Sequence, residues 1–262
     1  MRRLLLITVS VLVCASAAGS GAIRASTSAA PSWKIVALGD SDTTGQGDPT
    51  RVGWVGRYAA RLRQKLGLTV TVVNLAQEGM TSGQLLASVR SDSSTRSALK
   101  GAQIVLLGIG GADMNGGDTT LQGGKCKPEA CYAPVMEAFG RNFDATAASI
   151  RSLKRESKFV LRAITPETSV IGAEDLIPSF LKQYATRVSL YQGRSFGRLI
   201  CAGMTRHGGR CVNLVHPFNG PKGTDNAYRK GLMSRSECCY PTAKGQQLIA
   251  DLLYSTGLAP LR

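Results

Sequence analysis

The sequence contains only two histidines, His207 and His216, among 262 residues. Neither lies at the spacing that a zinc site requires, so we expect no metal site, and we expect no other cofactor. The lysines and arginines form no long basic run and are not interleaved with aromatic residues, which argues against nucleic-acid binding. The chain also lacks internal repeats and gives no sign of a second domain.

The sequence has no apolar run long enough to span a membrane. Its N-terminal run, Leu4–Val13, is too short to cross a bilayer. The dipeptide Arg2-Arg3 precedes this run and the small residues Ala15–Ala17 follow it, which is the layout of a secretory signal peptide. We therefore predict that residues 1–30 are a signal peptide and leader, that the protein is secreted, and that it has no transmembrane anchor. A lipoprotein site at Cys14 and a buried N-terminal helix are the alternatives.

The cysteines agree with export. Besides Cys14 the chain has six: Cys126, Cys131, Cys201, Cys211, Cys238 and Cys239. An even number in an exported protein suggests disulfides. The first four are close enough in sequence to form two short loops by pairing in order. The adjacent last two form either a vicinal bond or bonds to other cysteines, and the sequence does not choose between these arrangements.

The charge of the chain is strongly positive. Lys and Arg number 32 against 17 Asp and Glu, a net charge of +15. Such a charge suits attraction to an anionic cell envelope or an acidic glycan. A basic surface that only keeps the protein in solution is the alternative.

Five apolar runs separated by helical patterns indicate alternating strands and helices. The runs are Lys34–Leu38, Val70–Leu75, Ile104–Ile109, Phe159–Ile164 and Cys211–Val215. Helical spacing covers Trp54–Leu66, Ser82–Val89, Val135–Leu153 and Tyr184–Ile200, and Pro241-Thr242 opens a last helix. This alternation predicts an α/β fold, a three-layer α/β/α sandwich around a central parallel sheet of about five strands, in one domain of residues 31–262. We expect Gly108–Gly124 and Pro217–Cys239 to be long functional connections at the carboxyl edge of that sheet.

Four short motifs mark this edge. Gly39-Asp40-Ser41 follows the first strand, Asn74–Gly79 the second, and Gly108–Asp113 the third, while Glu237–Gly245 opens the last helix. In this order and spacing the chain resembles the SGNH/GDSL hydrolase family, from about Trp33 to about Leu258. The resemblance implies a flavodoxin-like sheet and ester hydrolysis on acyl esters of lipids or glycans.

The resemblance also implies residue roles. Ser41 corresponds to the family's nucleophile, and Gly79 to the glycine whose backbone N–H binds the oxyanion. Ala112 occupies the place of the family's oxyanion asparagine. Tyr240 occupies the place of its general-base histidine, and Glu237 the place of the aspartate that orients that histidine.

Two of these replacements weaken the expected chemistry. Losing one oxyanion donor at Ala112 costs roughly 2.7–4 kcal/mol of transition-state stabilisation. Tyrosine, with a pKa of about 10, is protonated at neutral pH and is a poor base for Ser41. Two residues offer compensation: His216, which follows the fifth strand, as a displaced base, and Asn115 as a substitute donor.

Two function classes therefore stay open. The first is a secreted ester hydrolase with a small-molecule ester substrate, which the replacements make weak or inactive. The second is a non-catalytic protein that binds a carbohydrate or the cell envelope in the same cleft, with Tyr240 stacking on a sugar.

Overall fold

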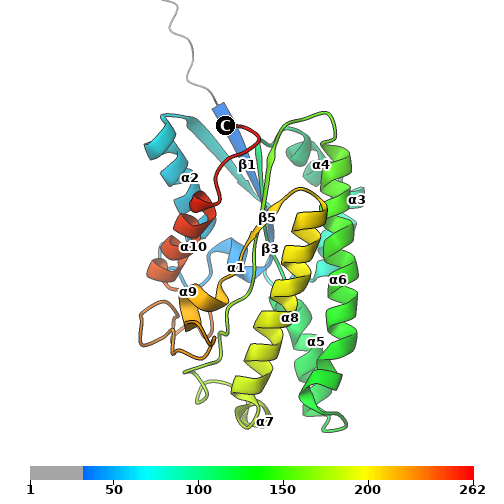
Figure 1. The fold of residues 1–262 in the computed structure, drawn as a ribbon, viewed down its shortest axis with the longest axis vertical. Helices are drawn as coiled ribbons and strands as arrows, with labels where there is room; N and C mark the ends of the chain where they lie inside the picture. The colour runs from blue at the N-terminus through cyan, green and yellow to red at the C-terminus, as the bar shows by residue number, and fades with distance from the viewer. Residues whose placement is uncertain (1–31) are drawn as a thin grey trace, which may run out of the picture.

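The computed structural model describes residues 32–262, which fold into a three-layer α/β/α sandwich (Figure 1). The expected signal peptide and Cys14 lie outside these residues. The strands are β1 (Ser32–Gly39), β2 (Thr69–Asn74), β3 (Ile104–Gly108), β4 (Val160–Ile164) and β5 (Arg210–Val212). They pair in parallel in the order β2-β1-β3-β4-β5. This is the flavodoxin-like order, so the predicted fold class is confirmed.

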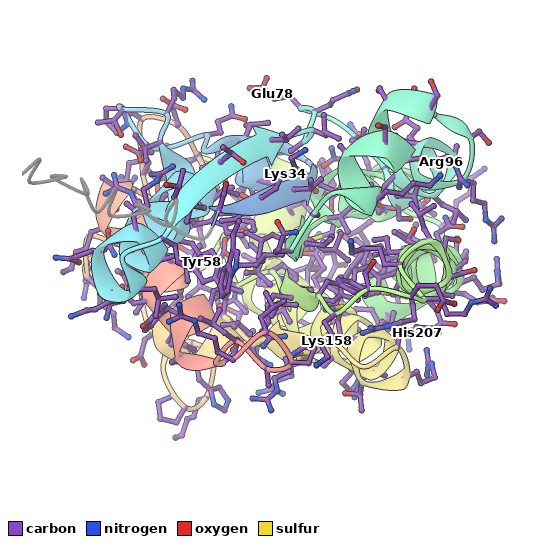
Figure 2. The ribbon with its side chains drawn as sticks, turned by 90° about the horizontal axis from the view of Figure 1, so that it is seen from above. Lys34, Tyr58, Glu78, Arg96, Lys158 and His207 are labelled. Carbon is purple, nitrogen blue, oxygen red and sulfur yellow. A yellow bond between two sulfur atoms is a disulfide. The ribbon has the colours of Figure 1, made fainter. Side chains whose placement is uncertain are left out.

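Helices cover both faces of the sheet (Figure 2). One face packs against α2 (Gly53–Leu66) and α10 (Ala243–Ser255). The other packs against α3 (Ser82–Ser91), α4 (Ser93–Lys100), α5 (Gly111–Gln122), α6 (Pro128–Leu153) and α8 (Ala185–Arg206). Successive side chains of β1 point to opposite faces of the sheet, so they enter two separate cores. Ile35 and Ala37 pack with α2 and α10, whereas Val36 and Leu38 pack on the other face. Three short helices complete the fold: α1 (Ser41–Thr44), α7 (Ser179–Lys182) and α9 (Val215–Asn219).

The expectation of a long connection over Gly108–Gly124 is wrong, because most of this stretch forms α5. Its glycines let α5 approach α6 closely: a Cβ on Gly117 would lie 2.0 Å from the ring of Tyr132. Packing of the two helices thus outweighs the low helix propensity of glycine.

Several element boundaries also differ from expectation: α6 begins at Pro128 instead of Val135, and α8 ends at Arg206 instead of Ile200. The fifth strand ends at Val212 instead of Val215, and Val215 opens α9. Helix α4 was not predicted. Its start is fixed by Asp92, whose carboxylate accepts a hydrogen bond from the backbone N–H of Thr95 at 2.7 Å.

The structure contains three disulfides, Cys126–Cys131, Cys201–Cys211 and Cys238–Cys239. The first two disulfides close the two short loops that the sequence suggested. The adjacent Cys238 and Cys239 are bonded to each other, which is one of the two arrangements that the sequence left open. Across residues 32–262, no helix has the length and apolarity needed to cross a bilayer.

Candidate active site

A cavity of about 380 Å³ lies at the carboxyl edge of the sheet. Ser41 after β1 and Gly108 at the end of β3 both line it. The strand order reverses direction between β1 and β3, and open α/β sheets place their ligands at such a switch point. Other walls come from the loop after β2, from α5, from the loop after β4 and from the segment before α10.

Asp40 fixes the turn that presents Ser41. Its carboxylate accepts hydrogen bonds at 2.9 Å from the backbone N–H groups of Gly110 and Gly111, and at 3.3 Å from that of Asp42. Burial raises the pKa of Asp40 to about 6, against the opposing effect of these N–H donors. The β1–α1 turn is thereby tied to the β3–α5 turn. The sequence analysis assigned Asp40 no such role, although its position directly before Ser41 was visible.

Ser41 and Tyr240 meet in the cavity. The Tyr240 hydroxyl donates a hydrogen bond to Ser41 Oγ over 3.2 Å. Burial is the main cause that raises the pKa of Tyr240, and the nearby carboxylates of Asp42, Asp40 and Glu78 add to it. The phenol is therefore protonated at neutral pH and acts on Ser41 as a donor, not as a base.

Glu237 lies away from this pair. Its carboxylate accepts a hydrogen bond from the backbone N–H of Gly47 at 3.0 Å and lies 3.6 Å from the Arg51 guanidinium. It is not among the residues that line the cavity. Glu237 therefore anchors the loop after α1 and does not orient Tyr240.

Gly79, Ala112 and Asn115 line the cavity with Ser41. Gly79 has φ of 73°, a conformation that glycine adopts most readily. Ala112 and Asn115 are three residues apart on α5 and share one face of the helix. Asn115 thus lies on the side of α5 that faces the cavity.

The structure does not bring either histidine to Ser41. His216 is exposed on α9, and His207 Nε2 lies 3.0 Å from the Asp144 carboxylate (Figure 2). Neither lines the cavity, and both lie in the described part of the chain. The geometry therefore gives no support to His216 as a displaced base.

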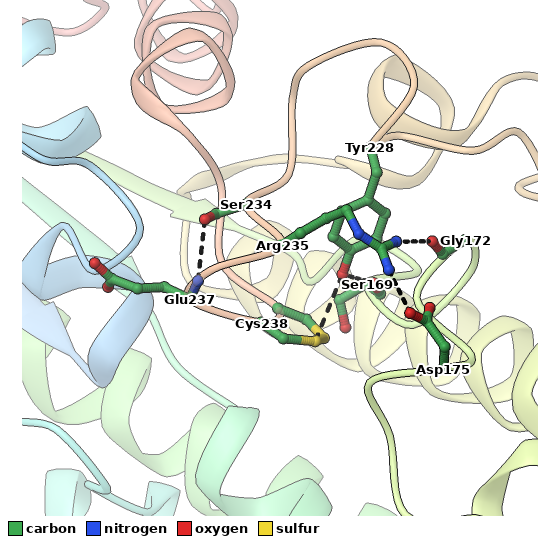
Figure 3. The surroundings of a disulfide bond; sticks show 9 residues. Ser169, Gly172, Asp175, Tyr228, Ser234, Arg235, Glu237 and Cys238 are labelled. Carbon is green, nitrogen blue, oxygen red and sulfur yellow. Dashed lines mark hydrogen bonds and ion pairs between the residues drawn. A yellow bond between two sulfur atoms is a disulfide. The ribbon is translucent and has the colours of Figure 1, made fainter.

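The segment that carries Tyr240 is held by the loop after β4 (Figure 3). The Tyr228 hydroxyl donates to the backbone carbonyl of Ser169 at 2.7 Å and lies 3.8 Å from Cys238 Sγ. The Arg235 guanidinium donates to the Gly172 carbonyl at 3.0 Å and to the Asp175 carboxylate at 2.5 Å. These contacts fix the vicinal disulfide and Tyr240 at the wall of the cavity.

Glu167 lines the cavity, as do Glu78 and Asp118, and none of the three was among the predicted site residues. Glu167 follows β4 by three residues and is only 8% exposed. Burial and the Asp40 carboxylate raise the pKa of Glu167 to about 7. Glu167 lies just beyond the carboxyl end of a strand that the sequence predicted, and this position could have marked it as a site residue.

Comparison with known proteins agrees with this geometry. The profile of the GDSL-like Lipase/Acylhydrolase family matches residues 37–248. Among curated proteins, the uncharacterized protein YpmR of Bacillus subtilis (strain 168) is 41% identical over 81 residues. That match spans 30% of this chain and 31% of the relative, so the chain is aligned with about a third of the relative's length.

Solved structures share the fold at low sequence identity. The lipase Lip_vut3 from a goat rumen metagenome superposes with a TM-score of 0.72 and 18% identity, over 88% of this chain and 100% of the other. An extracellular lipase from Streptomyces rimosus gives a TM-score of 0.61 and 15% identity, over 86% and 100%. The family profile covers most of the chain, with Ser41 and Gly79 inside the matched range. The chain therefore belongs to the GDSL-like lipase/acylhydrolase family.

Proposed function

We propose that the protein is a slow carboxylic ester hydrolase with Ser41 as its nucleophile. The observation that carries this proposal is the position of Ser41 Oγ, which lines the cavity at the switch point of the sheet within hydrogen-bond distance of Tyr240. Nucleophilic serines of this fold act from the same edge, where an ester carbonyl can approach both the hydroxyl and nearby backbone N–H groups.

The proposed mechanism begins with attack of Ser41 Oγ on the ester carbonyl carbon. The oxyanion receives hydrogen bonds from the backbone N–H groups of Ser41 and Gly79. Tyr240 holds Ser41 Oγ by donating to it. The Ser41 proton therefore points away from Tyr240 and passes to solvent water during the attack. Collapse of the tetrahedral adduct breaks the ester C–O bond, the alcohol leaves with a proton from water, and a second water molecule hydrolyses the acyl-Ser41 ester to the carboxylic acid and free Ser41.

The rate is expected to be low because no imidazole takes the Ser41 proton. Removal of one oxyanion donor reduces kcat by about 10²–10³. In a serine protease the loss of the histidine alone is about as damaging as the loss of the whole triad. Ala112 and Tyr240 impose both losses on this site.

The cavity favours a small substrate. Its volume of about 380 Å³ is near the lower end of small-molecule sites, roughly 300–1,000 Å³. We therefore propose short acyl esters, of lipid or glycan origin, as the substrate class. Secretion is supported by the N-terminal sequence pattern and by the three disulfides. The basic composition makes the anionic cell envelope the partner that we propose.

Active-site labelling tests this function. The purified, disulfide-intact protein is incubated with a serine-directed fluorophosphonate and, separately, with p-nitrophenyl acetate. We expect slow labelling and turnover that Ser41→Ala abolishes. Ser169→Ala removes another serine hydroxyl from the same cavity and is the matched control. Absence of labelling and turnover at every pH tested would refute the proposal and favour the non-catalytic binding protein.

A gain-of-function test addresses the missing groups. The double substitution Tyr240→His with Ala112→Asn restores the family's base and oxyanion donor. We expect a rise in kcat/KM of at least 10²-fold from the donor alone, with more from the base. The double substitution Tyr240→Phe with Ala112→Asn is the control, because it supplies the donor without a base.

A further inference from the structure

The cavity beside Ser41 has the opposite charge to the chain as a whole. The chain holds 32 lysines and arginines against 17 aspartates and glutamates. Within residues 32–262, however, every charged side chain that lines the cavity is a carboxylate: Asp42, Glu78, Asp118 and Glu167. A cleft lined by one sign of charge concentrates ligands of the opposite sign, so this cleft favours cations over anions.

These four carboxylates have no basic partner. In the described part of the chain none of them forms an ion pair with lysine or arginine, whereas most other carboxylates do, such as Asp48 with Arg57 at 2.8 Å. Asp118 accepts a hydrogen bond from the Tyr132 hydroxyl. The four cavity carboxylates therefore lack compensating positive side chains in residues 32–262, although the chain as a whole is basic.

Glu167 is the most buried member of the cluster. It is 8% exposed, lines the cavity, and receives no hydrogen bond from any other side chain among residues 32–262. Burial is the main cause that raises the pKa of Glu167 and that of Asp42. Repulsion from the Asp40 carboxylate raises both pKa values further, and Glu167 also acts on Asp42. A buried carboxylate without a donor is costly, and a ligand cation supplies both the charge and the donor.

The arrangement suits an organic cation better than a metal ion. Nowhere in residues 32–262 do three carboxylate, histidine or cysteine side chains converge closely enough to hold a metal. A protonated amine needs only one or two acceptors for its N–H groups. The Tyr240 ring, which also lines the cavity, is an additional surface for an ammonium group.

We propose that the cavity selects small esters that carry a protonated amine, and that Glu167 and Asp42 accept the hydrogen bonds of the ammonium group. The inference rests on the proposed function, since it assigns the substrate class of the Ser41 site. Glu78, exposed at the rim, adds to the attraction at the entrance.

A pair of isosteric esters tests the proposal. The alcohol part of 2-(dimethylamino)ethyl butyrate has the same shape as that of 3-methylbutyl butyrate, and differs by one protonated nitrogen in place of a carbon. Hydrolysis of both is followed by pH-stat at pH 7. We expect kcat/KM for the cationic ester to exceed that for the neutral ester by about tenfold or more, the size of one hydrogen bond to a charged group.

Variants tie this preference to the carboxylates. In Glu167→Gln the cationic-to-neutral ratio of kcat/KM should fall about tenfold. In Glu78→Gln, a substitution at an exposed rim position that is expected to fold normally, the ratio should fall by a smaller factor. The exposed Glu156→Gln is the control and should leave the ratio unchanged. An unchanged ratio in both Glu167→Gln and Glu78→Gln overturns the proposal.

A binding measurement separates failure of the subsite from failure of the proposed function. Calorimetry on the Ser41→Ala protein compares 2-(dimethylamino)ethanol with 3-methyl-1-butanol, and the comparison is repeated with Glu167→Gln added. Glu167-dependent preference for the amine supports the subsite even if no ester is hydrolysed, in which case only the proposed function fails. Equal kcat/KM for the two esters, with equal binding of the two alcohols, refutes the subsite and leaves ester hydrolysis standing.

Discussion

Replacing Glu167 with glutamine should change how the stability of the protein depends on pH. Burial holds the pKa of Glu167 at about 7 in the folded state, against 4.5 for an ordinary glutamate. This difference corresponds to roughly 3 kcal/mol of differential stability between the two protonation states. Glutamine keeps the shape of the side chain and cannot ionise.

The sign follows from proton counts. Below about pH 4.5 the carboxyl is protonated in both the folded and the unfolded state, and Glu167 imposes no electrostatic penalty. As the pH rises toward 7, the unfolded state releases this proton before the folded state does, so the free energy of unfolding falls. Above pH 7 the full penalty of about 3 kcal/mol applies to the wild type. The glutamine variant escapes it, and Asp42, no longer repelled by Glu167, ionises more easily.

Urea unfolding at pH 4, 6 and 8, at constant ionic strength, measures this effect through the fluorescence of the buried Trp54. The advantage of Glu167→Gln over the wild type should grow by roughly 3 kcal/mol from pH 4 to pH 8. Glu156→Gln, whose side chain is 88% exposed in the wild type, should show no such growth. Parallel pH curves for Glu167→Gln and the wild type would refute the electrostatic reasoning, because the burial of the carboxylate would then have no energetic consequence.

Three other substitutions or measurements test separate parts of the structure. Gly79→Ala and Gly67→Ala introduce a methyl group into open space at φ of 73° and 63°, so urea unfolding should give each a loss of about 1 kcal/mol. Only Gly79→Ala, which adds its methyl at the cavity, should also lower esterase kcat/KM. Arg162→Met removes a buried guanidinium that donates to the Leu161 and Gly257 carbonyls, and should lower the free energy of unfolding by about 2–4 kcal/mol in the same assay. Peptide mapping without reduction should recover Cys238 and Cys239 bonded within one peptide, and a peptide linking either to another cysteine would contradict the structure.

The sheet and the position of Ser41 were predictable because they depend on local patterns. Each buried strand is a short apolar run, and parallel strands align their carboxyl ends at one edge. Gly39-Asp40-Ser41 had to lie at that edge once β1 was identified. The helix α5 was not predictable in this way. Its glycines favour a loop in isolation, and only the close approach of Tyr132 from α6 explains why they are there.

The positions of several motif residues were predictable, but the places of Glu237 and His216 and the contacts within the site were not. The four motifs brought Ser41, Gly79, Ala112 and Tyr240 to one place, and all four line the cavity. The hydrogen bond from Tyr240 to Ser41 joins residues 199 positions apart, so no local pattern encodes it. Among residues 32–262, no lysine or arginine forms an ion pair with Glu167, and this too is a property of the folded chain, since lysines and arginines are abundant in the sequence.

The acidic cavity also determines how a histidine at position 240 should behave. The carboxylates of Asp42, Asp40 and Glu78 act on the group at this position, as the raised pKa of Tyr240 indicates. Burial, the main cause of the raised pKa of Tyr240, would lower the pKa of an imidazole at this position, whereas the negative neighbours favour its protonated form and oppose that effect.

A protonated imidazole cannot accept the Ser41 proton. The esterase activity of the Tyr240→His, Ala112→Asn double variant should therefore increase as the pH rises through the pKa of this histidine. Adding Glu78→Gln removes one of the three charges at the exposed rim and should move the midpoint of the pH–rate profile to lower pH. If that midpoint does not respond to Glu78→Gln, the carboxylates do not control the electrostatics of the site. The proposed selection of cationic esters would then lose its physical basis.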